Sequence, residues 1–332
     1  MLEHGGNLRA AMAQFTRAHG EWIDLSTGIN PQMFPVPVVP VEAWHRLPEP
    51  MPALIAAACE YYRAPAVLPV AGTQAAIQAL PQLRAHSRVA VVAPTYAEHA
   101  HQWRRAMHDV SEVNYAEIEA AVDTCDVLVL CNPNNPTGTL IAPEALLRWA
   151  DRLAARGGWL IVDEAFGDTV PAASVAHCSY RAGLIVLRSV GKFFGLAGLR
   201  LGFVAAEHCI LSALEEALGP WSVSGPAQQI GCAALSDVVW QTAMRTQLSE
   251  AGLRLQRLLA DHAIVSSGTA LFQWWPESDA AACRQHFAEA GIWVRLFTNG
   301  AGGIRLGLPP HEAGWQRLSD ALAAWIIKKG KR

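Results

Sequence analysis

The sequence predicts an α/β protein with a mainly parallel, helix-covered sheet in a large domain and a smaller α+β domain after it. Short apolar runs rich in β-branched residues alternate with helical patterns, which is typical of such a sheet. Polar residues follow the ends of these runs, and the pattern changes after Gly219-Pro220. The expected strands cover residues 67–70, 89–93, 127–131, 159–162, 184–187 and 201–205.

A crossover helix is expected between the third and fourth of these runs. Pro143-Glu144 suits the first turn of a helix, and Gly157-Gly158 would end it. Its apolar residues fall on one helical face: Leu146, Leu147, Ala150, Leu153 and Ala154. This amphipathic segment is therefore predicted to cover one face of the sheet.

The chain is predicted to consist of an N-terminal arm at residues 1–30, a large domain at 31–218 and a small C-terminal domain at 219–332. Residues 31–52 are rich in proline and favour an irregular connection. After Gly219-Pro220, one long helix is expected from about residue 227 to 259, with apolar strand-like runs at 270–275 and 292–296. These shorter runs indicate the second, α+β domain.

Composition indicates a globular enzyme with a substantial core, because 332 residues are 52% hydrophobic and 17% charged. A net charge of −3 gives no electrostatic reason to expect nucleic acid. No signal peptide or apolar run of membrane-spanning length is recognised, so we expect no membrane association and a cytoplasmic location. The seven cysteines lack C-x-x-C spacing, which favours reduced, mostly buried thiols and no metal site.

Polar side chains occur just beyond the ends of the expected strands. They are Gly72-Thr73-Gln74, Tyr96, Asn135, Asp163, Ser189 and Lys192. Ligands bind outside the carboxyl ends of strands in open α/β sheets. We therefore expect these segments to converge on one crevice.

Ser189, Lys192 and Arg200 have the chemistry that a phosphorylated aldehyde cofactor requires. A lysine amine forms a Schiff base with pyridoxal phosphate, while a hydroxyl and a guanidinium bind its phosphate. The amides of Gly72-Thr73-Gln74 at the start of a helix are further phosphate ligands, although a simple helix cap is an alternative. A surface lysine is the alternative for Lys192, but the neighbouring Phe193-Phe194 pair disfavours an exposed helix face.

Asp163 and Tyr96 are the expected contacts of the cofactor ring. A buried carboxylate needs a cationic partner or several donors, and a protonated pyridine nitrogen would supply the cation. Capping of the next helix is the alternative for Asp163. Tyr96 would stack on the ring, with core packing as its alternative, whereas Trp221 is expected in the core rather than in an active-site wall.

Taken in this order, the motifs resemble those of the fold type I pyridoxal phosphate enzymes, the aspartate aminotransferase superfamily, over about residues 20–310. The resemblance implies Lys192 and Asp163 as catalytic residues. It implies cofactor binding by Gly72, Thr73, Gln74, Tyr96, Asn135, Asp163, Ser189, Lys192 and Arg200. Within the superfamily, the chain is most similar to the L-threonine-O-3-phosphate decarboxylases of cobalamin biosynthesis, through His4-Gly5-Gly6-Asn7, Gly28-Ile29-Asn30-Pro31, Asp163-Glu164-Ala165-Phe166 and Pro220-Trp221-Ser222-Val223.

This resemblance implies decarboxylation of O-phospho-L-threonine to (R)-1-amino-2-propanol O-phosphate by a homodimer. It implies substrate binding by His4, Gly5, Asn30, Asn135, Arg295 and Arg305. An aminotransferase acting on histidinol phosphate is the alternative reaction, and a non-catalytic binding protein is a third reading.

The chain departs from the family pattern in two places. Leu47-Pro48-Glu49-Pro50 replaces the usual Tyr-Pro-Asp-Pro, whose phenol reaches the neighbouring subunit's cofactor phosphate. The connection between Arg295 and Arg305 is also shorter than usual, which bears on the roles of both arginines.

Overall fold

A computed structural model describes residues 4–298 and 302–330, which divide into two compact units. The larger unit comprises Met33–Asn135 and Leu140–Thr242. The smaller unit comprises the described residues up to Gln32, Pro136–Thr139 and the described residues from Ala243 onward. These divisions differ from the predicted boundaries, because residues 219–242 group with the larger unit and the N-terminal arm groups with the C-terminal residues.

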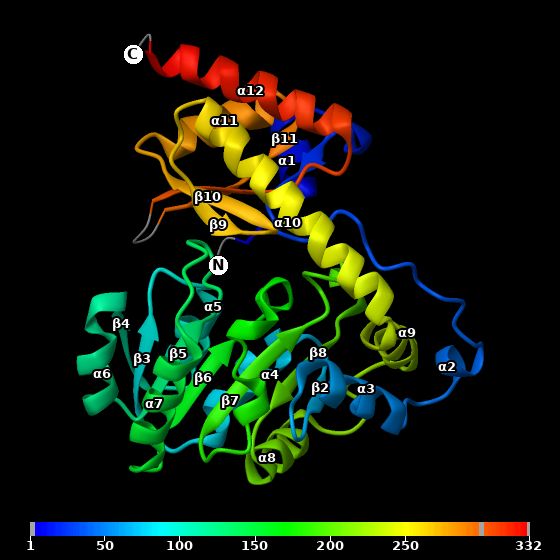
Figure 1. The fold of residues 1–332 in the computed structure, drawn as a ribbon, viewed down its shortest axis with the longest axis vertical. Coiled ribbons are helices and arrows are strands. Elements are labelled where there is room, and N and C mark those ends of the chain that lie inside the picture. The colour runs from blue at the N-terminus through cyan, green and yellow to red at the C-terminus, as the bar shows by residue number, and fades with distance from the viewer. Residues whose placement is uncertain (1–3, 299–301, 331–332) are drawn as a thin grey trace. The chain divides into compact units, whose positions relative to one another are not determined.

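Within the described residues, the larger unit contains a seven-stranded sheet in the order β2-β8-β7-β6-β5-β3-β4 (Figure 1). Its strands are β2 Leu68–Val70, β3 Arg88–Val92, β4 Asp109–Val113, β5 Val127–Cys131, β6 Trp159–Asp163, β7 Leu184–Ser189 and β8 Gly202–Ala205. The pairings are parallel from β4 to β7, and β8 is antiparallel to both of its neighbours. The prediction of a mainly parallel sheet is confirmed.

Strand β4 was not expected from the sequence. It lies at the sheet edge, where its sequence Asp-Val-Ser-Glu-Val is largely exposed. An edge strand needs no continuous apolar run, and its charged side chains discourage further strand pairing. The apolar-run criterion therefore misses it.

Helices cover both faces of this sheet. Those of the larger unit are α2 Glu42–His45, α3 Pro52–Tyr62, α4 Thr73–Ala79, α5 Glu98–Arg105, α6 Ile118–Thr124, α7 Pro143–Ala154, α8 His208–Leu218 and α9 Gly225–Ser236. Helix α7 matches the predicted crossover helix, with Leu146, Ala150 and Leu153 buried. Helices α4, α5 and α8 share a core with inward residues of the strands, including Val129, Ile161 and Ile185. Successive side chains of a strand point to opposite faces of the sheet. On the other face of this sheet, Phe203 of β8 contacts Tyr62 of α3.

The long helix predicted from residue 227 to 259 is wrong in one respect, because it is broken at Asp237. Helix α9 ends at Ser236, and α10 covers Val238–Asp261. The Asp237 carboxylate accepts a hydrogen bond from the backbone N–H of Trp240 at 2.9 Å, as an N-cap residue does. The Gln241 side chain donates to the carbonyls of Ala234 and Leu235, which α9 would otherwise leave unsatisfied.

Among the described residues, the smaller unit contains a four-stranded antiparallel sheet in the order β12-β13-β10-β9 and a parallel pair of β1 with β11. The strands are β1 Ile23–Asp24, β9 Ser267–Thr269, β10 Phe272–Pro276, β11 Ile292–Trp293, β12 Arg295–Phe297 and β13 Gly303–Gly307. Its helices are α1 Leu8–Phe15, α11 Ala280–Glu289 and α12 Glu312–Gly330, with most of α10. Phe15, Trp22 and Trp293 pack edge to face, which attaches α1 and β1 to this unit.

Two other expectations concern the chain as a whole. All seven cysteines lie in the described part of the chain and are free thiols, and Cys209 is the exposed one. No helix in residues 4–298 or 302–330 has the length and apolar character that a membrane-spanning helix needs.

Candidate active site

A pocket in the larger unit is lined by all nine residues predicted to bind a cofactor. These are Gly72, Thr73, Gln74, Tyr96, Asn135, Asp163, Ser189, Lys192 and Arg200, and they are joined there by Cys131, Ala165, Phe166, Gly191 and Ala197. Asp163 and Ser189 are the last residues of β6 and β7, so the pocket forms at the carboxyl ends of parallel strands. The expected convergence on one crevice is confirmed, and the individual roles stay predictions.

One end of the pocket combines a tight backbone turn with a guanidinium group. Gly72 precedes α4 with φ of 74°, a conformation that favours glycine. A Cβ at this position would lie 2.5 Å from Nη2 of Arg200, so the guanidinium lies directly against the turn. Arg200 Nη1 also donates to the carbonyl of Ala197 at 3.1 Å, which fixes its direction. This end of the pocket suits a phosphate group.

Ser189 and Lys192 follow from strand β7 into the turn that closes the pocket. The Ser189 hydroxyl accepts a hydrogen bond from the N–H of Gly191 at 3.1 Å. Lys192 is half-buried, and its Nζ lies 5.4 Å from the centre of the buried Phe166 ring. The expectation that Lys192 does not lie on an exposed helix face is confirmed.

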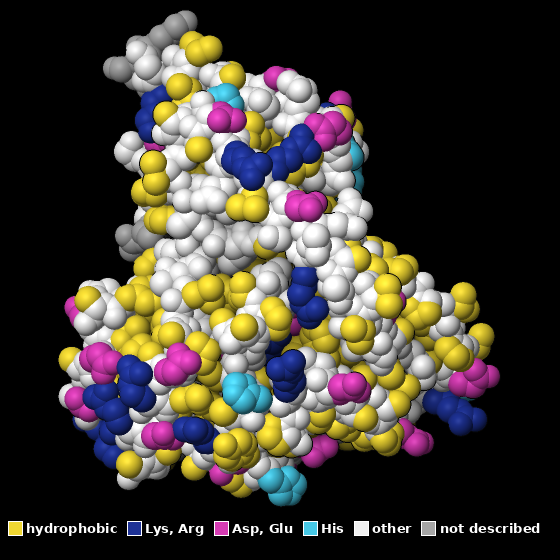
Figure 2. Space-filling model, in the orientation of Figure 1, with side chains coloured by type: hydrophobic (Ala, Val, Ile, Leu, Met, Phe, Trp, Pro, Cys, Tyr) yellow, Lys and Arg dark blue, Asp and Glu magenta, His cyan; other side chains and the backbone are white. Residues whose placement is uncertain are grey.

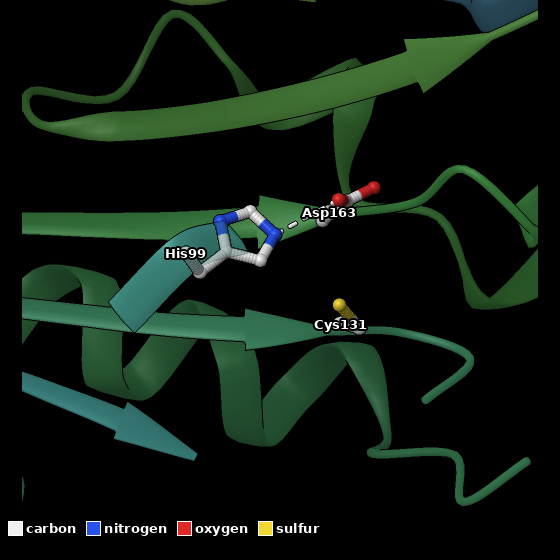
Figure 3. Close-up of side chains that lie close together, drawn as sticks. All are labelled: His99, Cys131 and Asp163. Atoms are coloured by element: carbon white, nitrogen blue, oxygen red, sulfur yellow. Dashed lines mark hydrogen bonds and ion pairs between the residues drawn. The ribbon is translucent and has the colours of Figure 1, made fainter. Parts of the chain in front are cut away.

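The opposite end of the pocket holds a buried ion pair that sequence reasoning missed. His99 Nε2 and Asp163 Oδ2 are 2.9 Å apart, and Cys131 lies beside them at the end of the neighbouring strand (Figure 3). Asp163 Oδ1 accepts the N–H of Ala165 at 3.0 Å. The structure thus supplies a cationic partner from the chain itself, in addition to the ring nitrogen predicted from the sequence.

Opposing effects set the pKa of His99. Burial by itself lowers that pKa, but the hydrogen bonds to Asp163 and Cys131 outweigh burial and raise it to about 10. His99 is therefore an imidazolium at neutral pH, paired with the carboxyl group of Asp163. His99 stands three residues after Tyr96, and the two rings meet edge-on with their centres 6.0 Å apart. A histidine at this spacing from the predicted Tyr96 is the signal that could have found it.

His99, Cys131 and Asp163 are also residue types that bind metal ions. Their ligand atoms lie within 4.8 Å of one another. Asp163 and Cys131 also line the pocket, so two of the three side chains face the space in which a ring nitrogen would lie.

A second set of hydrogen bonds orients Tyr96. Its hydroxyl donates to Gln74 Oε1 at 3.3 Å, and Gln74 Nε2 donates to Glu98 Oε2 at 2.8 Å. Gln102 also donates to this buried Glu98 carboxylate, at 2.9 Å. Burial, with the charges of Glu98 and Asp163, raises the pKa of Tyr96 to about 12, so it remains a phenol. No sequence pattern indicated Glu98.

Beneath the pocket, a buried ionic cluster joins the strands that carry Asp163 and Ser189. Arg188 binds the carboxylate of Glu164, and its Nη2 is 2.5 Å from Asp168 Oδ1. The Glu164 carboxylate also accepts the N–H of Val175 at 2.8 Å. Burial opposes the charge of Arg188, but the two carboxylates outweigh it and raise its pKa. Breaking such a cluster leaves an uncompensated buried charge, so it fixes β6 and β7 relative to each other.

The smaller unit contains the two predicted substrate arginines. Arg295 and Arg305 are direct partners on the antiparallel strands β12 and β13. Arg305 is buried, and its Nη2 donates to the Ser26 carbonyl at 2.6 Å. Burial and the charge of Arg295 lower the pKa of Arg305 to about 9, against the opposing effect of Asp24. Like charges directly opposite each other are unfavourable, so this pair favours a bound anion.

The other predicted substrate residues lie in both units. Gly5 contacts Ser26 so closely that an added Cβ would be 2.4 Å from its carbonyl oxygen. Asn30 is buried, and its Oδ1 accepts the N–H of Gln32 at 2.8 Å. His4, which is exposed, belongs to the same smaller unit, whereas Asn135 lines the pocket of the larger unit.

Comparison with known proteins identifies the family of the chain. The model of the family described as aminotransferase class I and II matches residues 41–313. A threonine-phosphate decarboxylase from Pseudomonas aeruginosa is 52% identical over 323 residues, which is 97% of each chain.

Solved structures share the fold. An L-threonine-O-3-phosphate decarboxylase from Porphyromonas gingivalis has a TM-score of 0.77 at 20% identity, covering 91% of this chain and 99% of its own. A histidinol-phosphate aminotransferase from Sinorhizobium meliloti, in complex with pyridoxal-5'-phosphate, has a TM-score of 0.81 at 18% identity, covering 98% and 96%. The predicted fold class and superfamily are confirmed. The chain belongs to the aminotransferase class I and II family.

Proposed function

We propose that this chain is a pyridoxal phosphate-dependent carboxy-lyase that converts O-phospho-L-threonine to (R)-1-amino-2-propanol O-phosphate for cobalamin biosynthesis. The observation that carries the proposal is the 52% identity to a threonine-phosphate decarboxylase over 97% of both chains. The opposed Arg295 and Arg305 support it, because the substrate carries a carboxylate and a phosphate.

The residues of the pocket fit pyridoxal 5'-phosphate, which agrees with the family and with the cofactor of a related structure. In our proposal, Arg200, Ser189 and the amides at Gly72-Thr73-Gln74 hold its phosphate. Asp163 would bind the ring nitrogen, and the amine of Lys192 would bind the aldehyde carbon. Tyr96 lies against the ring face, and Asn135 completes the wall.

Bound there, the cofactor supplies an electron sink for the electron pair that is left on the α-carbon when carbon dioxide departs. His99 Nε2, 2.9 Å from Asp163 Oδ2, orients the Asp163 side chain, which would stabilise positive charge on the ring nitrogen. When the amino group of the substrate replaces Lys192 at the aldehyde carbon and passes its proton to the freed amine, Lys192 Nζ would donate that proton to the electron pair on the α-carbon. Water exclusion around Lys192 is aided by the buried Phe166 ring.

Substrate orientation decides the outcome of the reaction. We propose that His4, Gly5, Asn30, Asn135, Arg295 and Arg305 bind the two anionic groups of the substrate. Holding the carboxylate so that its bond to the α-carbon is perpendicular to the ring favours decarboxylation. Presenting the α-hydrogen in that position would favour transamination instead.

The test is an assay of the purified holoprotein with O-phospho-L-threonine. We expect carbon dioxide and aminopropanol phosphate in equal amounts. The alternative, a histidinol-phosphate-type aminotransferase, predicts glutamate from histidinol phosphate and 2-oxoglutarate. Efficient amino transfer without gas release would overturn the decarboxylase proposal.

We also propose that the chain acts as a homodimer in the cytoplasm. Exposed apolar side chains support the dimer, namely Met33, Val36, Val38, Val41, Trp44, Leu47 and Trp221. Figure 2 shows that hydrophobic side chains gather on parts of the visible face. Val38 is 98% exposed and Trp44 69% exposed, and the expectation that Trp221 packs in the core is wrong, since it is 60% exposed. Exposed apolar patches of this kind mark interaction sites. Sedimentation at micromolar concentration tests the dimer, and a monomer would refute it.

A further inference from the structure

Ser26 connects three parts of the smaller unit that are far apart in the sequence. Its hydroxyl accepts a hydrogen bond from the N–H of Gly6 at 2.8 Å and lies 2.6 Å from Asp24 Oδ1. Its carbonyl accepts the bond from Arg305. The residue is completely buried. A single serine therefore contacts both the N-terminal segment and a predicted substrate arginine.

The direction of these hydrogen bonds is determined by their chemistry. A carboxylate is an acceptor, so the single hydroxyl hydrogen of Ser26 is donated to Asp24. The hydroxyl oxygen is then left with lone pairs, which suit the Gly6 N–H. Asp24 Oδ1 also accepts the backbone N–H of Ser26 at 2.9 Å, so the carboxylate holds Ser26 in one orientation.

The N-terminal segment is shaped to lie on Ser26. Gly6 has φ of +84°, and a side chain at Gly5 would collide with the Ser26 backbone. Helix α1 begins two residues later, with Asn7 as its cap, and buries Ala11 in the cluster of Trp22 and Trp293. A chain end that would otherwise fray is thus held by α1 on one side and by the Ser26 hydroxyl on the other.

We infer that Ser26 is a positioning residue that fixes the segment His4-Gly5-Gly6 in place beside Arg305, so that the phosphorylated substrate meets a preformed anion site. This inference rests on the proposed function, in which His4, Gly5 and Arg305 bind substrate anions. Preorganisation of this kind improves binding because the ordering of the segment is complete before the ligand arrives. The hydroxyl acts on substrate binding and leaves the cofactor pocket unaffected.

The variant Ser26→Ala isolates this hydroxyl. It keeps the carbonyl for Arg305 and the N–H for Asp24, and it removes the acceptor for Gly6 together with the bond that the hydroxyl donates to Asp24. We expect the KM for O-phospho-L-threonine to rise roughly three- to tenfold, as the loss of the hydrogen bond to Gly6 implies, with kcat within about twofold of wild type. The Kd for inorganic phosphate should rise by a similar factor, and hydrogen exchange at the Gly6 amide should accelerate.

Ser266→Ala is the matched control, because it removes a hydroxyl that bonds to Gln273 in the same unit. It should leave KM, phosphate affinity and Gly6 exchange unchanged. In a His4→Ala background, Ser26→Ala should raise KM by less than about twofold, since the two residues act on one segment. A loss in kcat rather than KM, full additivity with His4→Ala, or an unchanged Gly6 exchange rate would overturn the inference.

Gly6 exchange and phosphate affinity are independent of the reaction. If O-phospho-L-threonine is not decarboxylated but both quantities change as expected, the proposed function fails and the positioning role of Ser26 stands. If decarboxylation is confirmed and both quantities remain at wild-type values, the positioning role fails alone.

Discussion

The cofactor pocket of the larger unit and the anion-binding residues of the smaller unit are built in different ways. The pocket collects the ends of neighbouring strands, so residues from separate motifs meet because the sheet is parallel. In the smaller unit, two arginines instead lie opposite each other, and one of them, Arg305, donates a hydrogen bond to the carbonyl of Ser26, 279 positions away in the chain. The pocket is determined by topology, and the anion site by individual long-range contacts.

The electrostatics of the two regions differ in the same way. Next to the pocket, His99 is paired with Asp163, and the buried Arg188 is paired with the carboxylates of Glu164 and Asp168. In the smaller unit, the charge of Arg295 lowers the pKa of Arg305. A balanced site is stable when empty, whereas a site with opposed like charges gains from the arrival of an anion. Variants of the pocket should therefore change cofactor attachment or activity, whereas variants of the arginine pair should change the KM for the substrate.

The largest effect should come from Lys192→Ala. Activity should fall roughly 10³-fold or more, because both the amine that binds the cofactor and the proton donor are lost. Borohydride treatment of the holoprotein should attach the cofactor to Lys192 in wild type and leave the variant unlabelled, as mass spectrometry of peptides will show. Lys328→Ala, which removes an exposed lysine of α12, should behave as wild type. A labelled, active Lys192→Ala protein would refute the assignment of the pocket.

Arg305→Ala tests the other region. The KM for O-phospho-L-threonine should rise by roughly 100-fold, because the variant loses charge-assisted hydrogen bonds to an anionic group of the substrate. Cofactor attachment to Lys192 should be unchanged, because Arg305 lies in the smaller unit. Arg317 also donates to a backbone carbonyl of that unit, so Arg317→Ala is a matched control that should keep its KM. Loss of cofactor attachment in Arg305→Ala would mean that the two regions do not act separately.

A smaller effect is expected for His99→Gln, which keeps a donor for Asp163 but removes the charge. The kcat should fall roughly tenfold, because that factor corresponds to the free energy of one hydrogen bond to a charged group. His101→Gln, an exposed position on the same helix, is the control.

The pH dependence of stability distinguishes a charged His99 from a neutral one. The pKa of His99 in the folded chain is about 10, above its ordinary value of 6.5. Its stabilisation is therefore fully present below about pH 6.5 and is lost as the pH rises through about 10. The unfolding free energy of the wild type, measured with urea, should fall more steeply over this range than that of His99→Gln. Parallel curves would show that His99 is uncharged.

The smallest effect should be seen with Gly72→Ala. Gly72 and Gly219 have nearly the same positive φ, but a Cβ meets Arg200 at Gly72 and nothing within 4 Å at Gly219. Alanine strains the backbone at both positions, so the difference between the variants isolates the contact with Arg200. The Kd of the cofactor, measured by absorbance, should rise roughly three- to tenfold in Gly72→Ala and stay unchanged in Gly219→Ala. Equal changes in both variants would argue against a phosphate site at this turn.

Expectations based on local patterns succeeded where the physical rule is itself local. The apolar runs predicted the central strands, and the amphipathic segment predicted α7. The pattern failed at β4, whose edge position removes the need for apolar residues, and at Asp237, where one carboxylate caps a new helix. In both cases a neighbour in space, rather than the periodicity, decided the structure.

The sequence by itself determined the sheet, the chemical types at its strand ends and their order along the chain, because the direction of parallel strands brings their carboxyl ends to one edge. Only the tertiary structure decided which groups pair: His99 with Asp163, Glu98 with Gln74, and Ser26 with Gly6 and Arg305. Such pairs depend on distances of about 3 Å between residues that are remote in the chain. Packing of the complete fold sets those distances, and no local pattern contains them.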